Sequence, residues 1–114
     1  MEAIEALGEP VRRRIVELLA RGGRPAGDLA ERIGHEFGIS QPATSRHLRV
    51  LREADVVTST VNGQQRIYAI NRDTFDDLAD WVESVRSFWT QRLDALETEL
   101  ARGRRTTKTE EDEA

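Results

Sequence analysis

One short stretch of this chain combines residue types that could read a nucleic acid. In residues 40–54, Thr44, Leu48 and Leu51 recur at spacings of four and three, which predicts a helix with a single buried stripe. Ser40 can cap this helix through its hydroxyl group. The opposite face is polar and cationic, and it consists of Gln41, Pro42, Ser45, Arg46 and Arg49. Arginine can bind guanine, glutamine can bind adenine, and small polar residues let the backbone approach phosphates, so this face suits a DNA major groove.

A plainer interpretation is that Arg46 and Arg49 only solvate a surface helix. The flanking sequence favours the binding interpretation. A third helix is expected from Asp28 onward, and Gly38 ends it just before the next helix begins, which gives a helix, a turn and a helix. Two shorter helices are expected before it, in residues 1–7 and from residue 10.

A hairpin is expected after the predicted helix of residues 40–54, over residues 57–70. The apolar period changes to two there, and Asn62-Gly63 is the pair best suited to a type I′ turn. Arg66 lies beside the expected tip, where it could contact the DNA backbone or minor groove; the alternative is an arginine that only pairs across the strands. The chain is therefore predicted to be mainly α with a β-hairpin wing, a winged helix-turn-helix.

The longest predicted element begins at Asp73. Apolar residues recur along it at alternating spacings of three and four, the pattern of paired helices, so we expect a long C-terminal dimerisation helix. The residues expected at the dimer interface are Val82, Val85, Trp89, Leu93, Leu96 and Leu100. We expect one DNA-binding and dimerisation domain over residues 1–101 and a disordered charged tail over residues 102–114.

Catalysis and metal binding find little support. Ser45 and His47 are two apart on a helix and do not face each other, and no phosphate-binding GxxxxGK motif occurs. The acidic residues at the start of the long helix are explained by the helix dipole rather than by a cation. The chain has no cysteine. We therefore expect no enzyme activity, no metal site and no cofactor.

Net charge and hydropathy limit which classes of protein remain possible. The formal charge of −4 is unevenly distributed, because residues 1–72 carry +2 and residues 73–114 carry −6. Since a local patch decides where DNA docks, the acidic total does not exclude a DNA-binding protein. No apolar run approaches the length of a membrane span, and the first residues do not resemble a signal peptide. We expect a cytoplasmic protein with no membrane partner.

Over residues 4–100 the sequence resembles the ArsR family of bacterial winged-helix repressors. The segments that carry the resemblance are LGEPVRRRIVELL, LAERIG, FGISQPATSRHLRVLREADVV and the hairpin ending RIYAI. The resemblance implies a homodimer that inserts one recognition helix per subunit into successive major grooves of a partly palindromic operator. It also implies groove contacts by Gln41, Ser45 and Arg46, with Pro42 close to the backbone; Arg49 is added from helix geometry.

Two features depart from the family pattern. The segment from Leu29 to Ser40 is four residues longer than is common, and because four residues are nearly one helical turn, we predict a lengthened third helix rather than a loop. The chain also lacks the cysteine and paired Asp and His ligands of metal-responsive relatives. One alternative stays open, a winged-helix protein-interaction module that uses the long C-terminal helix. Within the DNA-binding class, a repressor that responds to an unidentified small-molecule effector and a constitutive binder without any effector also both stay open.

Overall fold

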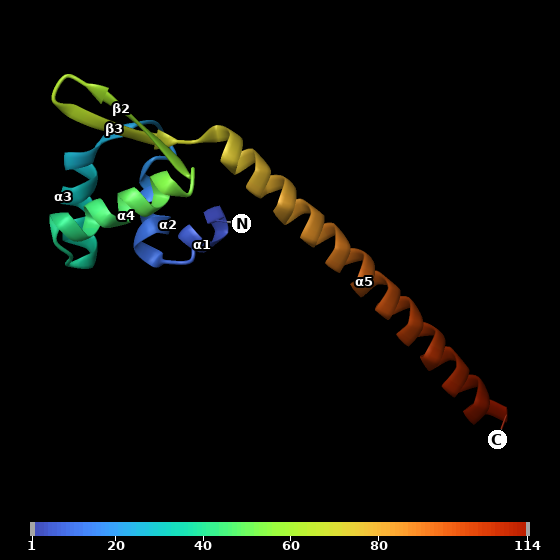
Figure 1. Cartoon of the computed structure of the whole chain (residues 1–114). Helices are drawn as coiled ribbons and strands as arrows, with labels where there is room; N and C mark the ends of the chain where they lie inside the picture. Colours follow the sequence, from blue (N-terminus) through green and yellow to red (C-terminus); the bar gives the residue numbers. More distant parts are fainter. Residues whose placement is uncertain (1, 114) are drawn as a thin grey trace. The chain divides into compact units, whose positions relative to one another are not determined.

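The computed structural model describes the backbone of residues 2–113 and the side chains of residues 2–104. Its elements follow the predicted order (Figure 1). They are α1 (Glu2–Ala6), α2 (Pro10–Leu18), β1 (Arg24–Pro25), α3 (Ala26–Phe37), α4 (Gln41–Glu53), β2 (Val57–Asn62), β3 (Gln65–Ile70) and α5 (Arg72–Glu113). The predicted winged helix-turn-helix with a long C-terminal helix is confirmed.

The chain divides into two units, residues 1–78 and residues 79–114. The first unit contains the core, to which the helices, β2 and β3 all contribute. Its fully enclosed side chains include Ile15, Leu29, Ile33 and Leu51, each with no exposed surface. These apolar side chains recur at helical spacing, so burying them fixes how α2, α3 and α4 pack together.

The predicted lengthening of the third helix is confirmed. α3 runs without interruption from Ala26 to Phe37, two residues earlier than the expected start. It ends at Gly38, which adopts the left-handed conformation with φ 67° and ψ 31° that glycine tolerates without steric cost. The four additional residues therefore extend the helix by about a turn and keep Ile33 on the buried face, whereas Phe37, which was expected on the same face, is 39% exposed at the end of the helix.

The sheet differs from the predicted hairpin in two respects. A third strand, β1, pairs antiparallel with β3, so the strand order is β1-β3-β2. Asn62 pairs with Gln65, so the turn is formed by Gly63 and Gln64 rather than by Asn62-Gly63. Gly63 has φ 66°, the sign required at the first central residue of a type II′ turn. The prediction of the turn residues was therefore wrong by one position, because the strand register carries Asn62 into β2.

α5 is one uninterrupted helix from Arg72 to Glu113 (Figure 1). Its first turns belong to the first unit, where Phe75 and Leu78 pack against the core. The prediction of a disordered tail falls largely on residues 105–114, whose side chains lie outside the described part, and the boundary at residue 101 stays a prediction. No helix in the described part of the chain is both long and apolar enough to cross a membrane.

Candidate nucleic-acid interface

The start of α4 is fixed by its predicted cap. Ser40 has the extended backbone of an N-cap residue, with φ −73° and ψ 161°, and its Oγ accepts a hydrogen bond from the backbone N–H of Ala43 at 3.2 Å. Thr44 is completely buried, and its hydroxyl group donates to the Ser40 carbonyl oxygen at 3.3 Å. With Leu48 and Leu51 also buried, the inner face of α4 is held against α2, α3 and β2.

The predicted reading face of α4 is free of packing. All five predicted contact residues on this helix are exposed, namely Gln41, Pro42, Ser45, Arg46 and Arg49. Among the residues whose side chains are described, no ion-pair partner is found for Arg46 or Arg49. Two arginines on one exposed face without a carboxylate partner leave their guanidinium donors available for an external acceptor.

The wing carries the sixth predicted contact, Arg66. Its Nη1 donates to the Ser59 hydroxyl group of the adjacent strand at 3.0 Å, and the side chain is exposed. This is the cross-strand position that the sequence offered as the alternative. A single exposed hydrogen bond from the guanidinium to an uncharged hydroxyl is weaker than one to an anionic phosphate, so it can be exchanged for a phosphate contact. Close to the turn, Val61 is 70% exposed, so the tip of the wing is not packed on the core.

The basic triplet in α2 is already engaged with the protein. Arg12 Nε donates to the Ala6 carbonyl oxygen, and Arg13 Nη1 donates to the Leu7 carbonyl oxygen at 3.3 Å. Arg14 pairs with two carboxylates, those of Glu17 and Glu36. These three arginines serve the structure of the first unit, unlike Arg46 and Arg49.

The Arg14–Glu36 pair ties the lengthened part of α3 to α2. Arg14 Nε and Nη2 donate to the two carboxylate oxygens of Glu36 at 2.8 and 3.0 Å, and Arg32 Nε adds a third hydrogen bond at 3.0 Å. Arg14, with help from Arg32, lowers the pKa of Glu36 from 4.5 to about 2, and Glu36 in turn raises the pKa of Arg14. The extra turn that precedes the recognition helix is thereby anchored to the rest of the unit.

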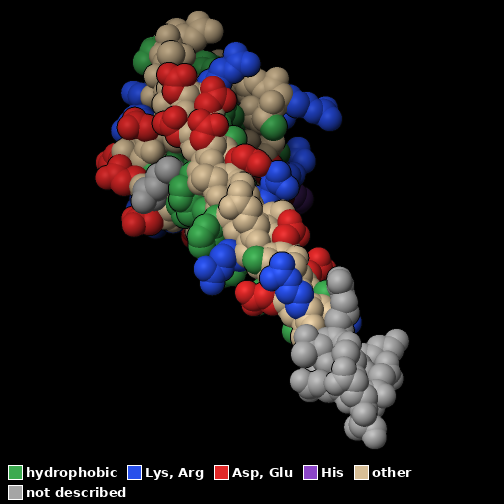
Figure 2. Space-filling model, turned by 90° about the vertical axis from the view of Figure 1, so that its right-hand side faces the viewer, with side chains coloured by type: hydrophobic (Ala, Val, Ile, Leu, Met, Phe, Trp, Pro, Cys, Tyr) green, Lys and Arg blue, Asp and Glu red, His purple; other side chains and the backbone are tan. Residues whose placement is uncertain are grey.

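The predicted dimer face of α5 is apolar and mostly uncovered in the single chain. Of the predicted interface residues, Val85 is half-buried and the others are 52–60% exposed: Val82, Trp89, Leu93, Leu96 and Leu100. Figure 2 shows hydrophobic side chains on the surface of the described part of α5. Trp81 and Phe88, which lie beside the predicted seam, are 46% and 56% exposed, and Phe88 meets the Trp89 ring edge-on at 6.0 Å between centroids. Several exposed apolar side chains along one helix are typical of an interface.

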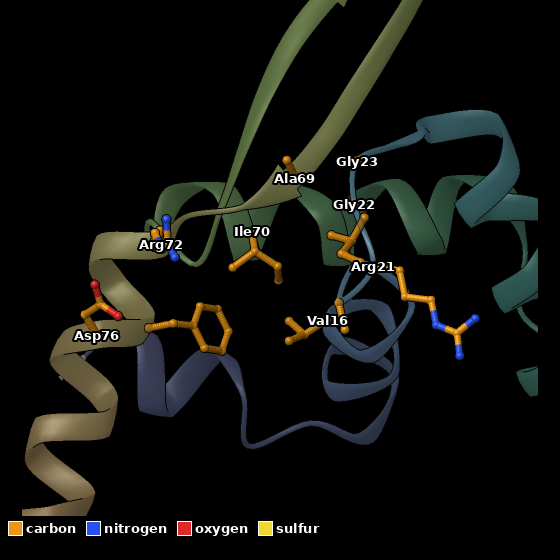
Figure 3. Close-up of a pocket in the computed structure, with 11 residues that line it drawn as sticks. Val16, Arg21, Gly22, Gly23, Ala69, Ile70, Arg72 and Asp76 are labelled. Carbon is orange, nitrogen blue, oxygen red and sulfur yellow. The ribbon is translucent and has the colours of Figure 1, made fainter.

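A cavity of about 580 Å³ lies in the first unit, where α2, β3 and the start of α5 meet (Figure 3). The Phe75 ring, Val16 and Ile70 form its apolar lining, and Arg72 and Asp76 flank it. The sequence did not predict this cavity, because ordinary core-type residues far apart in the chain line it. Within the residues that the structure describes, no three His, Cys, Asp or Glu side chains gather closely enough to hold a metal ion.

Comparison with known proteins places the chain among transcriptional regulators. Residues 7–60 match the family model of a helix-turn-helix domain. The chain is 37% identical over 78 residues to the transcriptional repressor SdpR of Bacillus subtilis, covering 68% of this chain and 82% of that protein. It is 36% identical over 91 residues to the HTH-type transcriptional regulator Rv2034 of Mycobacterium tuberculosis, covering 80% and 78% respectively.

Solved structures agree with this similarity. The crystal structure of a possible transcriptional regulator for arsenical resistance is 35% identical, with a TM-score of 0.66 over 87% of this chain and 96% of that chain. An ArsR-like transcriptional regulator from Rhodococcus sp. RHA1 is 26% identical, with a TM-score of 0.69 over 85% and 88% of the two chains. The sequence and structural similarities therefore extend well beyond the recognition helix.

Proposed function

Because the chain belongs to the ArsR family of helix-turn-helix transcriptional regulators, we propose that it is a homodimeric repressor that binds a partly palindromic DNA operator. The recognition helix is α4, and the hairpin formed by β2 and β3 is the wing. Such a regulator acts where the DNA is, in the cytoplasm of a bacterial cell. The proposal includes no enzyme activity and no metal.

The exposed face of α4 carries this proposal. Arg46 and Arg49 have donors suited to guanine O6 and N7, and Gln41 can form two hydrogen bonds with adenine. Ser45 and Pro42 are small enough to let the helix approach the DNA closely, and both are exposed. The buried stripe on the other side of α4 keeps this face directed outward, as groove insertion requires.

The wing adds a contact beside the groove. Arg66 can exchange its hydrogen bond with Ser59 for a DNA phosphate or for the narrow minor groove, since a guanidinium binds an anionic phosphate more strongly than an uncharged hydroxyl. This contact positions the protein and contributes less to the choice of sequence than the contacts of α4 do.

The apolar face of α5 supports the homodimer. Its exposed side chains would be covered by the same face of a second copy, the self-complementary arrangement of a twofold dimer. Two recognition helices related in this way would reach half-sites about one helical turn, roughly 34 Å, apart. The alternative of a protein-interaction module is not favoured, since the relatives described above are named as transcriptional regulators or repressors.

A small-molecule effector is the remaining part of the proposal. An effector must bind the DNA-competent and DNA-incompetent dimers with different affinities. The cavity around Phe75 is suited to this, because a molecule there would touch β3 of the wing hairpin and the beginning of α5 together. Its volume lies within the range of small-molecule sites.

The decisive experiment is a fluorescence-anisotropy titration with a duplex from immediately upstream of the gene that encodes this chain. Preference over a scrambled duplex, with affinity that falls steeply as salt increases, would support binding to groove and phosphates. The variant Arg46→Ala should weaken operator binding by about 1–3 kcal/mol without changing helicity or dimerisation.

Arg21→Ala is the matched control, since it removes the same charge from an exposed position outside α4 and the wing. An equal loss of affinity in both variants would contradict a specific contact by Arg46. Loss of secondary structure in Arg46→Ala would mean that this side chain is structural. Equal binding of both duplexes by the unmodified protein would contradict recognition of this operator.

A further inference from the structure

One side chain, Arg12, connects three helices of the first unit. Its Nε donates to the carbonyl oxygen of Ala6, the last residue of α1. Its backbone N–H donates to Glu9 Oε2 at 3.2 Å, which makes Glu9 the side-chain cap of α2. Its Nη1 lies 3.1 Å from Nδ1 of His47 on α4. The contact with His47 joins the start of α2 to the recognition helix.

This contact assigns a hydrogen-bonding role to Nδ1 of His47. A guanidinium group has donors and no acceptor, so Nδ1 must accept the hydrogen bond from Arg12. With Nδ1 accepting from Arg12, the ring nitrogen left to donate is Nε2. The same Nδ1 lies 3.9 Å from Glu9 Oε2, a carboxylate oxygen that accepts hydrogen bonds. Glu9 is therefore a nearby second partner for Nδ1, and it suits the ring when Nδ1 carries a proton.

We propose that Arg12 and Glu9 are positioning residues for the recognition helix and that they act through His47 as a proton-sensitive link. In the neutral state Nδ1 accepts from Arg12. In the protonated state Nδ1 cannot accept, the imidazolium and the guanidinium repel each other, and the Nδ1–H donates to Glu9 instead. This inference rests on the proposed DNA-binding function and adds a way to regulate it.

Protonation would disturb both ends of the link. Glu9 would have to share its carboxylate between the cap of α2 and His47, which weakens the cap. The other charged groups around Arg12 are the carboxylates of Glu2 and Glu5 on α1 and of Glu53 on α4, which line a surface hollow with it. These carboxylates would retain Arg12 after His47 has released it, so α4 would lose this contact.

The direction in which operator affinity changes with pH distinguishes this link from a simple charge effect. Added positive charge on a DNA-binding helix strengthens phosphate binding, so a simple charge effect raises affinity as pH falls. Loss of the Arg12–His47 contact lowers operator affinity as pH falls. The pH range that matters is 8 to 5.5, where histidine side chains commonly change charge.

The test compares two full-length proteins that differ at residue 47. Both carry His35→Gln, because His35 is the other histidine in the sequence, and one also carries His47→Asn. Asparagine keeps an oxygen acceptor near the position of Nδ1 and does not titrate. At constant ionic strength, the protein with His47 should lose roughly 2- to 12-fold in operator affinity between pH 8 and 5.5, the equivalent of one hydrogen bond. The His47→Asn protein should change by less than about twofold.

Two further measurements test the contact itself. Nitrogen-15 NMR at pH 8 should find the proton of His47 on Nε2. Arg12→Lys keeps the charge but not the planar donors that reach Ala6 and His47 together, so it should lower operator affinity at pH 8.

The outcomes separate the inference from the proposed function. Equal pH dependence in the two proteins, a proton on Nδ1 at pH 8, or unchanged affinity in Arg12→Lys would overturn the link while DNA binding stood. Absence of any preference for the operator at pH 8, in every variant, would overturn the proposed function and the link with it.

Discussion

Leu93 gives a quantitative test of the proposed dimer. It lies in the middle of the apolar face of α5 and is 58% exposed in the single chain. Burying a whole leucine side chain stabilises by about 1.5–3 kcal/mol, so covering the exposed part would contribute about 1–2 kcal/mol per subunit. Because a dimer contains two copies, Leu93→Ala should weaken dimerisation by about 2–3.5 kcal/mol. This corresponds to a roughly 30- to 300-fold increase in the dimer dissociation constant.

A charged variant at the same position should have a larger effect. Leu93→Glu removes the apolar contact and also requires a carboxylate to be desolvated or the interface to open. We expect this variant to be monomeric at micromolar concentrations. Gln91→Glu is the matched control, because it introduces the same carboxylate on α5 two residues earlier, where the side chain does not face that of residue 93.

Sedimentation velocity over a concentration series measures the dissociation constants, and circular dichroism checks that the first unit stays folded. A dimer of undiminished affinity in Leu93→Glu would refute the assignment of the α5 seam. Equal weakening by Gln91→Glu would show that net charge, rather than the apolar face, controls association. A monomeric unmodified protein would refute the homodimer altogether.

Two further predictions concern the lengthened α3. Glu36→Gln should lower the melting temperature at pH 7, because it removes the ion pairs with Arg14 and Arg32 that depress the folded-state pKa of Glu36. The stabilisation by these ion pairs is present above pH about 4.5 and is lost as pH falls toward 2. The difference from the unmodified protein in thermal unfolding scans should therefore close over this range, and a constant difference would contradict the ion pair. Gly38→Ala should destabilise the protein by about 1–2 kcal/mol in urea unfolding, whereas Gly38→Asn should cost less, since asparagine tolerates φ 67° better and nothing obstructs a Cβ there. Equal costs for alanine and asparagine would contradict a purely conformational origin.

Local patterns were sufficient to predict most of the fold. Ser40 and the spacing of Thr44, Leu48 and Leu51 predicted α4, and the structure has that cap and that buried stripe. The period that links Ile33 to the earlier apolar residues of α3 predicted a longer helix instead of a loop, and this also holds. Both predictions succeeded because the interactions involved lie within one helix.

Features that depend on residues far apart in the sequence were not predictable in this way. β1 contains only Arg24 and Pro25, and it exists because β3 offers an edge to pair with. The turn shifted from Asn62-Gly63 because the pairing register across the sheet outweighs the local turn preference. The candidate site divides in the same way. The exposure of Arg46 was predictable from α4 alone, whereas the contact between Arg12 and His47 was not, because it joins residues 35 positions apart.

The two halves of the proposed mechanism are physically linked through α5. One recognition helix offers only a few base contacts, and a second, tethered copy makes the next half-site contact effectively intramolecular. Disrupting the dimer should therefore weaken operator binding even though α4 itself is unchanged. Leu93→Glu, with every residue of the α4 face intact, should lose its preference for the full operator yet still bind one half-site with the affinity of a single subunit. Arg46→Ala should show the opposite pattern, an unchanged dimer with weaker contacts at each half-site, so measuring both variants on full and half operators separates the reading face from the seam.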